Sequence, residues 1–231
     1  MKGGEAQKFI DFYQQLALNP AVLPQRVRVM NPYQDPNSEA MRLVKAFHLQ
    51  FFNDNHPRKL LVGINPGRHG AGVTGIPFTD TPALQEHCGI TTPLETRETS
   101  ATFVYEFIKA YGGAEVFYQD WFIGGVCPLG FLVRNKKDNW VNWNYYDDRQ
   151  LQENVTPFIL AKLQEQIALC GHPTQCVVLG TGKNFKFLNQ LNKQHALFEK
   201  ITPLEHPRYV MQYKLKQKEH YIAKFLEVLT A

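Results

Sequence analysis

Hydrophobic residues recur at helical spacing near the start of the chain. One such pattern predicts a helix over residues 5–18, which the Asn19-Pro20 pair ends because proline does not continue a helix. A second helix is predicted over about residues 38–52, with the break at His56-Pro57. The residues that set the first pattern are Phe9, Phe12, Tyr13 and Leu16.

Short apolar runs alternate with helical patterns through the rest of the chain. Continuous apolar runs are typical of strands buried on both faces, and their alternation with helices is typical of a parallel sheet covered on both sides. The predicted strands cover residues 59–64, 119–127, 176–180 and 198–201. The predicted helices that follow cover residues 99–111, 150–169, 183–194 and 213–229. We therefore predict an α/β fold, a three-layer α/β/α sandwich with a central, mostly parallel four-stranded sheet.

Two segments lack a regular period. Residues 65–98 are rich in Gly, Pro and Thr and are predicted to form a long ordered loop, and loops of this length are usually functional when they are ordered. Residues 134–149 are polar, aromatic and irregular. No repeat or low-complexity tract divides the chain, so we predict a single domain over residues 1–231, in which residues 1–57 form an N-terminal helical part.

Composition and charge narrow the class of protein only slightly. The 231 residues are 44% hydrophobic and 20% charged, as in globular proteins. A net charge of +4 permits a polyanionic partner without requiring one. No apolar run reaches the roughly 18 residues of a membrane span, and the N-terminus lacks the apolar stretch of a secretion signal. We expect an intracellular, cytoplasmic protein, associated with the nucleoid if it is bacterial, with no membrane partner.

Three polar or aromatic side chains fall near the carboxyl ends of predicted strands, where parallel α/β sheets bind ligands. Asn65 precedes a Pro-Gly turn that can hold its side chain in one place. Phe78 follows a proline and can stack on a planar ligand. His206 stands two residues before Arg208, and a neutral histidine can donate to a developing anion while arginine can hold phosphate. Each taken singly has a simpler interpretation: an ordinary turn, a core phenylalanine and a structural histidine.

The order of these motifs resembles a known family. Gly63-Ile64-Asn65-Pro66-Gly67, followed by Thr74-Gly75-Ile76-Pro77-Phe78, resembles the first motif of single-strand-selective monofunctional uracil-DNA glycosylases. Cys127-Pro128-Leu129 resembles the central strand-end motif, residues 179–185 resemble the Gly-x-Gly strand-to-helix turn, and His206-Pro207 resembles the second catalytic motif. Order and spacing agree from about residue 58 to residue 230. The pattern looks like a second, bacterial-type branch of this family within the uracil-DNA glycosylase superfamily.

The resemblance implies roles for individual residues. It implies that Asn65 orients the water that attacks the sugar, that His206 stabilises negative charge on the departing base, and that Phe78 stacks on the flipped base. The other substrate-binding positions that it implies are Gly63, Pro66, Gly67, Ala71 and Gly125. Candidates for contacts with DNA phosphates are Arg68, Lys183, Arg208 and Lys214.

Three positions depart from the family pattern. The family reads the pyrimidine edge with an asparagine where this chain has Gly125, and a pocket without that amide has fewer ways to reject other bases. The second motif lacks the longer continuation after His206-Pro207-Arg208-Tyr209, which predicts a shorter wedge into the duplex. Ala71 replaces a bulkier pocket residue. A mismatch-specific glycosylase, or one that releases hypoxanthine or xanthine, is therefore an alternative with the same fold.

The chemistry implied by the resemblance needs no cofactor and no metal. Cleavage of an N-glycosidic bond leaves positive charge on the sugar and negative charge on the base. A donor such as neutral His206 stabilises that state more than the ground state, and the amide of Asn65 is enough to orient water. We expect a monofunctional enzyme of base-excision repair that leaves an abasic site, because no lysine is spaced as a Schiff-base nucleophile.

Cysteine and histidine spacing predicts neither a metal site nor an iron–sulfur cluster, although some members of the superfamily carry one. The cysteines Cys88, Cys127, Cys170 and Cys176 stand alone, which predicts reduced structural thiols. We expect a monomer that acts on DNA, as a single strand or a damaged duplex. The alternative from another class is a non-catalytic nucleic-acid or nucleotide-binding module, for which residues 180–183 (Gly-Thr-Gly-Lys) offer a partial phosphate-binding pattern.

Overall fold

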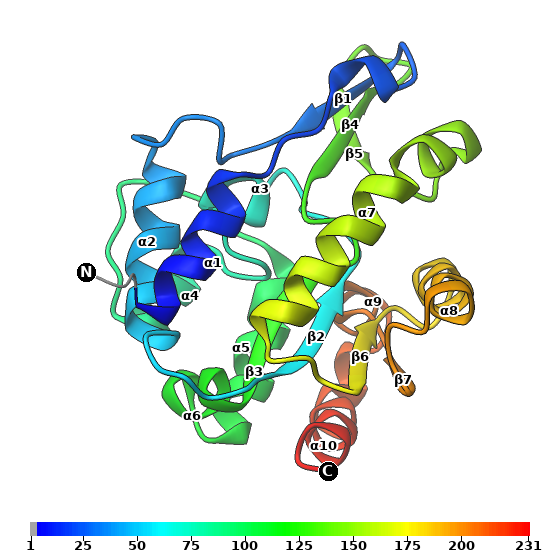
Figure 1. Cartoon of the computed structure of the whole chain (residues 1–231). Helices are drawn as coiled ribbons and strands as arrows, with labels where there is room; N and C mark the ends of the chain where they lie inside the picture. Colours follow the sequence, from blue (N-terminus) through cyan, green and yellow to red (C-terminus); the bar gives the residue numbers. More distant parts are fainter. Residues whose placement is uncertain (1–3) are drawn as a thin grey trace.

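The central layer is a four-stranded sheet in which every neighbouring pair of strands is parallel (Figure 1). The computed structural model describes residues 4–231. The strands, in the order β3-β2-β6-β7, are β3 (Trp121–Gly125), β2 (Lys59–Gly63), β6 (Gln175–Leu179) and β7 (Lys200–Leu204). The inner strands β2 and β6 are buried along nearly their whole length, as continuous apolar strands in a covered sheet are. The predicted fold class is confirmed.

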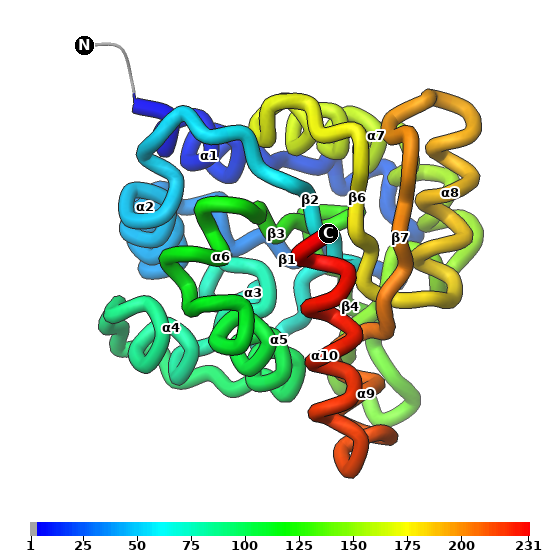
Figure 2. The backbone as a smooth tube through the Cα atoms, turned by 90° about the horizontal axis from the view of Figure 1, so that it is seen from below, coloured from blue at the N-terminus to red at the C-terminus, as the bar shows by residue number. Residues whose placement is uncertain are grey.

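Helices cover both faces of this sheet. Figures 1 and 2 agree that α1 (Glu5–Gln14) and α7 (Arg149–Leu169) lie over one face, and that α5 (Thr99–Tyr111) and α10 (Lys218–Leu229) lie over the other. The remaining helices are α2 (Glu39–Phe51), α3 (Ala71–Thr74), α4 (Thr81–Cys88), α6 (Ala114–Asp120), α8 (Lys183–His195) and α9 (Pro207–Tyr213), with 3₁₀ turns η1 (Pro20–Val22) and η2 (Leu215–Gln217). The helices predicted over 38–52, 99–111, 150–169 and 183–194 therefore agree with α2, α5, α7 and α8.

A second, antiparallel sheet was not expected from the sequence. Its strands, in the order β1-β4-β5, are β1 (Val27–Met30), β4 (Gly130–Arg134) and β5 (Trp140–Trp143). The predictions that residues 134–149 are irregular and that residues 1–57 are helical are therefore wrong in part. β5 is a short strand of mixed polarity, and its pairing with β4 through a tight turn, closed by hydrogen bonds between Asn135 and Asn139, defines it.

Several element boundaries differ from the predicted ones because tertiary contacts move them. α1 ends at Gln14 because the chain turns away, and the Leu16 carbonyl accepts from the Asn31 amide at 2.7 Å. The segment predicted as a strand over 119–127 begins with the end of α6. The segment predicted as a helix over 213–229 is divided among α9, η2 and α10. The predicted loop 65–98 contains the helices α3 and α4, and the strand predicted over 198–201 corresponds to β7.

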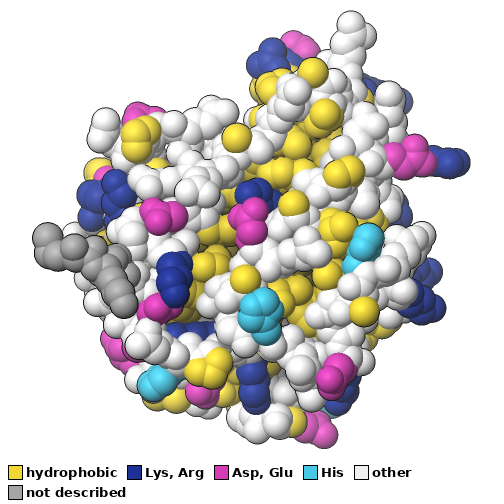
Figure 3. All heavy atoms as spheres, in the orientation of Figure 1, with side chains coloured by type: hydrophobic (Ala, Val, Ile, Leu, Met, Phe, Trp, Pro, Cys, Tyr) yellow, Lys and Arg dark blue, Asp and Glu magenta, His cyan; other side chains and the backbone are white. Residues whose placement is uncertain are grey.

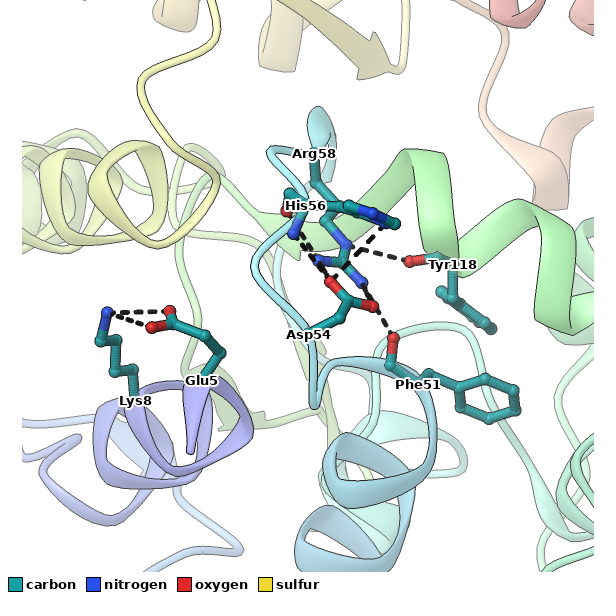
Figure 4. Close-up of polar contacts among 7 residues, drawn as sticks. All are labelled: Glu5, Lys8, Phe51, Asp54, His56, Arg58 and Tyr118. Atoms are coloured by element: carbon teal, nitrogen blue, oxygen red, sulfur yellow. Dashed lines mark hydrogen bonds and ion pairs between the residues drawn. The ribbon is translucent and has the colours of Figure 1, made fainter. Parts of the chain in front are cut away.

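A buried arginine joins the start of β2 to the helices beside it (Figure 4). Arg58 is 3% exposed, and its guanidinium donates to the Asp54 carboxylate and to the carbonyls of Phe51 and Tyr118, both at 3.1 Å. A buried arginine needs this complete set of acceptors, because its charge is costly to remove from water otherwise. The cluster therefore fixes where β2 enters the sheet, relative to the ends of α2 and α6.

The carboxyl edge of the parallel sheet gathers the segments that the sequence singled out. β2 and β3 end side by side, with Gly63 paired to Gly125, and the next two amides beyond β3 donate to the carbonyls of Gly63 and Ile64. His206 follows β7 and is the N-cap residue of α9. In the orientation of Figure 1 this edge faces the small sheet at the top of the view.

The surface charge is mixed on the face seen in Figure 3. Lys and Arg side chains there are interspersed with Asp and Glu, so the net charge of +4 does not form one basic region on that face. Among residues 4–231, no helix has the length and apolar character of a membrane span.

Candidate active site

A cavity of about 490 Å³ opens at the carboxyl edge of the parallel sheet, between β2, β3, α1 and the loop after β2. Seven positions proposed from the sequence line this one cavity: Gly63, Asn65, Pro66, Gly67, Ala71, Phe78 and Gly125. Residues that the sequence analysis did not select complete the walls, among them Tyr33, Glu98 and Gln166. The segments 63–78 and 125, far apart in the chain, therefore converge on one space at this edge of the sheet.

Phe78 forms a fixed wall of this cavity. Its φ of +52° lies in the left-handed region, which a bulky side chain rarely adopts. The turn that holds it is closed by the Thr74 hydroxyl, which donates to the Thr79 carbonyl at 2.7 Å. A Cβ atom at Gly63 would lie 2.7 Å from the Phe78 ring, so glycine is required where β2 meets the ring. The ring is therefore held in place by its surroundings at the wall of the cavity.

The Asn65 amide is oriented by backbone groups of the segment after β5. Its Oδ1 accepts from the Tyr145 N–H at 3.2 Å, and its Nδ2 lies 3.4 Å from the Trp143 carbonyl and 3.3 Å from that of Pro66. This set assigns the oxygen and the nitrogen of the amide unambiguously. The oxygen keeps a second lone pair, which can accept a hydrogen from a water molecule in the cavity.

Tyr145 is itself held by a buried asparagine. The Tyr145 hydroxyl donates to Asn184 Oδ1 at 2.7 Å, and Asn184 Nδ2 donates to the carbonyl of Leu179 at 3.0 Å and to that of Gly63 at 3.3 Å. Asn184 thus joins the ends of β2 and β6 to the segment that orients Asn65. Such supporting hydrogen bonds reduce the freedom of a reactive side chain.

His206 lies beside Phe78, with the two ring centroids 5.8 Å apart. Its Nδ1 accepts from the Arg208 N–H at 3.2 Å and caps α9. Burial, and to a lesser extent the Arg208 charge, lower the pKa of His206 to about 4, so the ring is neutral near neutral pH. Because Nδ1 accepts a hydrogen bond, the neutral ring carries its proton on Nε2. The site therefore presents one neutral N–H donor.

A groove of cationic side chains adjoins the cavity and shares Gly67 and Glu98 with it. The groove is lined by Arg68, Arg97 and Arg208, all exposed, together with His69 and Asn142. Asn142 Oδ1 accepts from the Arg68 N–H at 2.9 Å, which ties β5 to the loop after β2. Two of the proposed phosphate contacts, Arg68 and Arg208, therefore share one groove, and Arg97 is an addition that the sequence analysis missed.

Comparison with known proteins agrees with this arrangement. The sequence profile of the uracil DNA glycosylase superfamily matches residues 49–230. The chain belongs to the uracil DNA glycosylase superfamily. Among solved structures it is similar to SMUG2 from Pedobacter heparinus, with 42% sequence identity and a TM-score of 0.94 over 100% of this chain and 98% of that chain. The comparison with curated proteins found no match. The predicted resemblance is confirmed.

One end of the cavity lies at Gly125, the position that the resemblance implies for reading the base. Gly125 carries no side chain, and a Cβ atom there would lie 2.9 Å from the Cys127 carbonyl oxygen. Instead, the buried Gln166 of α7 reaches this point: its Oε1 accepts from the Gly125 N–H at 3.1 Å, and its Nε2 donates to the Gly125 carbonyl at 3.0 Å. A Cβ atom at Gly124 would lie 2.0 Å from Gln166 Oε1, so glycine at position 124 leaves room for this amide.

The pattern of apolar residues in α7 could have identified Gln166 from the sequence. The buried residues of α7 recur at helical spacing, namely Leu151, Val155, Ile159, Leu163 and Ile167, and Gln166 lies among them on the buried side of the helix. A polar residue on the buried side of a helix needs partners, because leaving it without a hydrogen bond is costly.

Glu98 is a further residue that the sequence analysis missed. It stands between the cavity and the cationic groove, and a Cβ atom at Gly70 would lie 1.8 Å from its carboxylate. Burial raises the pKa of Glu98 to about 7, with a smaller contribution from Asp80, while the nearby Arg208 opposes the shift. This carboxyl group therefore exchanges a proton near neutral pH at the mouth of the site.

Lys183 and Lys214 do not line the cavity or the groove described above. Lys183, at the start of α8, lies 3.8 Å from the Asp147 carboxylate and over the Tyr146 ring. Lys214 lies between α9 and η2. The cysteines predicted as structural thiols are free and buried. In the part of the chain that the structure describes, no group of three or more His, Cys, Asp or Glu side chains is arranged to hold a metal.

Proposed function

We propose that the protein is a monofunctional DNA glycosylase that hydrolyses the N-glycosidic bond of uracil in DNA and leaves an abasic site, acting as a monomer without a metal ion. The observation that carries this proposal is the convergence of Asn65 and Phe78 on one cavity, with the neutral donor of His206 beside it, in a member of the uracil DNA glycosylase superfamily. We propose that residues 4–231 act as one domain, while residues 1–3 of the predicted domain lie outside the described residues.

In this mechanism His206 acts on the leaving base. As the bond between C1′ and the base nitrogen breaks, the electron pair goes to the base, and Nε2–H donates to a carbonyl oxygen that gains negative charge. A fixed donor of this kind stabilises the transition state more than the ground state. A neutral ring suits the role, because an imidazolium in a dry cavity carries a desolvation cost.

Asn65 acts on the nucleophile. The sugar becomes cationic as the base leaves, so water needs orientation more than activation. The free lone pair of Asn65 Oδ1 holds one hydrogen of the water, whose oxygen bonds to C1′ and whose remaining proton passes to solvent. The products are the base, first as its anion, and an abasic sugar with a hydroxyl group at C1′.

The test of this proposal is release of uracil from a labelled single-stranded oligonucleotide, with a chelator in a parallel reaction. We expect an alkali-sensitive abasic site in both reactions, without strand cleavage before alkali. Absence of release from uracil and from deaminated purines would favour the binding-module alternative. Loss of activity with chelator would contradict the metal-independent mechanism.

A second candidate, release of hypoxanthine or xanthine at the same site, is favoured by the Gln166 amide. Both of its N–H groups are used by the carbonyls of Gly125 and Lys162, whereas Oε1 has one lone pair left. An acceptor at this end matches the N–H of uracil and equally the N–H of hypoxanthine, and it repels the ring-nitrogen lone pair of cytosine. We therefore propose that the site selects for a ring N–H more than for the pyrimidine shape.

Substitution of Gln166 tests this selection. Gln166→Leu is expected to lower kcat/KM for uracil by about tenfold and to reduce the preference for uracil over cytosine by a similar factor, because one hydrogen bond to the base is lost. Single-turnover rates on uracil, hypoxanthine and cytosine oligonucleotides measure both effects. The matched control is Gln164→Leu, on the exposed side of the same helix. An unchanged ratio between the bases in Gln166→Leu would show that Gln166 only supports β3.

A preference for single-stranded DNA is also proposed. Of the five large hydrophobic side chains exposed among the described residues, three follow His206 within ten positions: Tyr209, Tyr213 and Leu215. The Tyr209 and Tyr213 rings lie 5.6 Å apart. Unpaired bases stack on exposed aromatic rings regardless of sequence, and Arg208 and Lys214 beside them suit the phosphates.

A further inference from the structure

Two arginines of the small sheet stack on one tryptophan. The guanidinium carbon atoms of Arg28 and Arg134 each lie 4.4 Å from the centre of the Trp140 ring. The register explains the contact: Arg134 is directly opposite Trp140, and Arg28 is opposite Leu132, the next residue on this face of the central strand. Three strands therefore contribute to one stack, with Arg28 from β1, Arg134 from β4 and Trp140 from β5.

This stack borders the cationic groove of the candidate active site. Residues two apart on a strand point to the same face and lie about 7 Å apart. Trp140 and Asn142 are such a pair on β5, and Asn142 lines the groove together with Arg68 and Arg208. The stack therefore continues the groove by one step along β5, away from the cavity.

The two arginines are available to a ligand. Both are exposed, and the Arg28 side chain makes no hydrogen bond and no ion pair with any described residue, while its backbone pairs with β4. Arg134 donates to the carbonyl and carboxylate of Asp138, whose side chain is 83% exposed. A solvent-exposed ion pair such as Arg134–Asp138 is weak, so Arg134 can leave the Asp138 carboxylate and bind a phosphate group instead. Lys136 and Lys137, in the adjoining turn, add positive charge to the same end of the sheet.

We propose that the Arg28–Trp140–Arg134 stack binds backbone phosphates of the DNA strand that flanks the target nucleotide. A guanidinium that stacks on a ring keeps its N–H edges free, and these edges match phosphate oxygens in geometry. The ring also holds both side chains in place before DNA arrives, so less conformational entropy is lost on binding. The inference rests on the proposed function, because it takes DNA as the substrate, and it adds a binding surface outside the cavity.

The test compares two uracil substrates. One is a single-stranded oligonucleotide that extends several nucleotides on both sides of uracil, and the other ends at the phosphates that flank it. In the double variant Arg28→Gln/Arg134→Gln we expect KM to rise by roughly tenfold more on the long substrate than on the short one. The salt dependence of binding to the long strand should fall by about 1.4 in log–log slope, for two lost phosphate contacts.

The controls separate this surface from folding and from catalysis. Lys109→Gln removes an exposed cation at the end of the sheet opposite to the cavity. We expect it to change neither the KM difference between the two substrates nor the salt dependence of binding. Arg28→Lys/Arg134→Lys keeps the charge and should retain most of the slope while losing affinity. If the double glutamine variant does not fold, Arg28→Gln alone, at an exposed side chain, should lower the slope by about 0.7.

The outcomes are distinct for the two proposals. If the folded double variant changes KM by the same factor on the long and the short substrate, and the salt dependence of binding is unchanged, the stack does not bind phosphate. A parent protein that binds the single strand but releases no base, and whose slope falls in the double variant, would support the stack and contradict the proposed glycosylase activity.

Discussion

His206→Ala is expected to lower the rate of uracil release by about 10²–10³-fold with little change in DNA affinity. The physical reason is the loss of the neutral Nε2–H donor of His206 beside the cavity, and removal of a single preorganised donor to a developing anion typically has this cost. Single-turnover kinetics at saturating enzyme measures the chemical step directly, and binding to a non-cleavable strand measures affinity separately.

A matched variant separates catalysis from capping, since His206 also begins α9. Asparagine is a strong helix cap, so His206→Asn should retain the stability that alanine loses. Its side chain is shorter than that of histidine, so we expect the rate to remain low. If His206→Asn released uracil at the parental rate, His206 would be a cap and not a catalytic residue.

The pH dependence of the rate provides an independent check on the protonation state. The pKa of His206 is lowered to about 4, so the ring is neutral above that pH and gains a proton below it. That proton goes to Nδ1, which then no longer accepts from Arg208, and the rate is expected to fall as pH falls through about 4. Glu98, with its pKa raised to about 7, is the other titrating group at the mouth, and Glu98→Gln should remove any inflection near pH 7.

The second large effect is expected from Asn65→Ala, which should lower the rate by about 10²-fold because the attacking water loses its orientation. Base stacking on Phe78 is unaffected by this change, so substrate affinity should remain near that of the parent. Rates at saturating enzyme, together with fluorescence-based affinity for a non-cleavable strand, distinguish the two quantities. A variant with parental rate would contradict the assignment of the water to Asn65.

Tyr145 offers a positioning test of the same assignment. Tyr145→Phe removes the hydroxyl that donates to Asn184 while leaving the backbone N–H that donates to Asn65. We expect a loss of roughly tenfold in rate with unchanged KM, because one supporting hydrogen bond is removed. Tyr146→Phe is the matched control: its hydroxyl forms no hydrogen bond among the described residues. Equal rates in both variants would remove Tyr145 from the positioning network.

Local sequence determined the architecture of the main sheet. The apolar runs at 59–64 and 176–180 are too short for helices and too continuous for half-exposed strands, so burial on both faces was the only arrangement that suited them. The same reasoning placed Asn65 and His206 at one edge, because parallel strands bring their carboxyl ends together. Four long helices agreed with their predicted ranges because each carries a continuous apolar side.

Other features depended on contacts between distant segments. The strand β5 has no strong pattern of its own and exists because β4 pairs with it, so a reading of residues 134–149 alone gave an irregular segment. Gln166 and Glu98 are separated from the motifs by many residues, and only folding brings them to the cavity. The sequence marks Gln166 as a polar residue on the buried side of its helix, but it does not indicate which distant glycine this side chain reaches.

The sequence by itself determined the parallel α/β sheet and the family, and it predicted the reactive pair Asn65 and His206, because these depend on short-range patterns of burial and on ordered motifs. Only the tertiary structure decided the tautomer and pKa of His206, the amide that faces Gly125, and the second sheet with its arginine-flanked tryptophan. Each of these depends on desolvation or on hydrogen bonds between segments far apart in the chain, which no local pattern encodes.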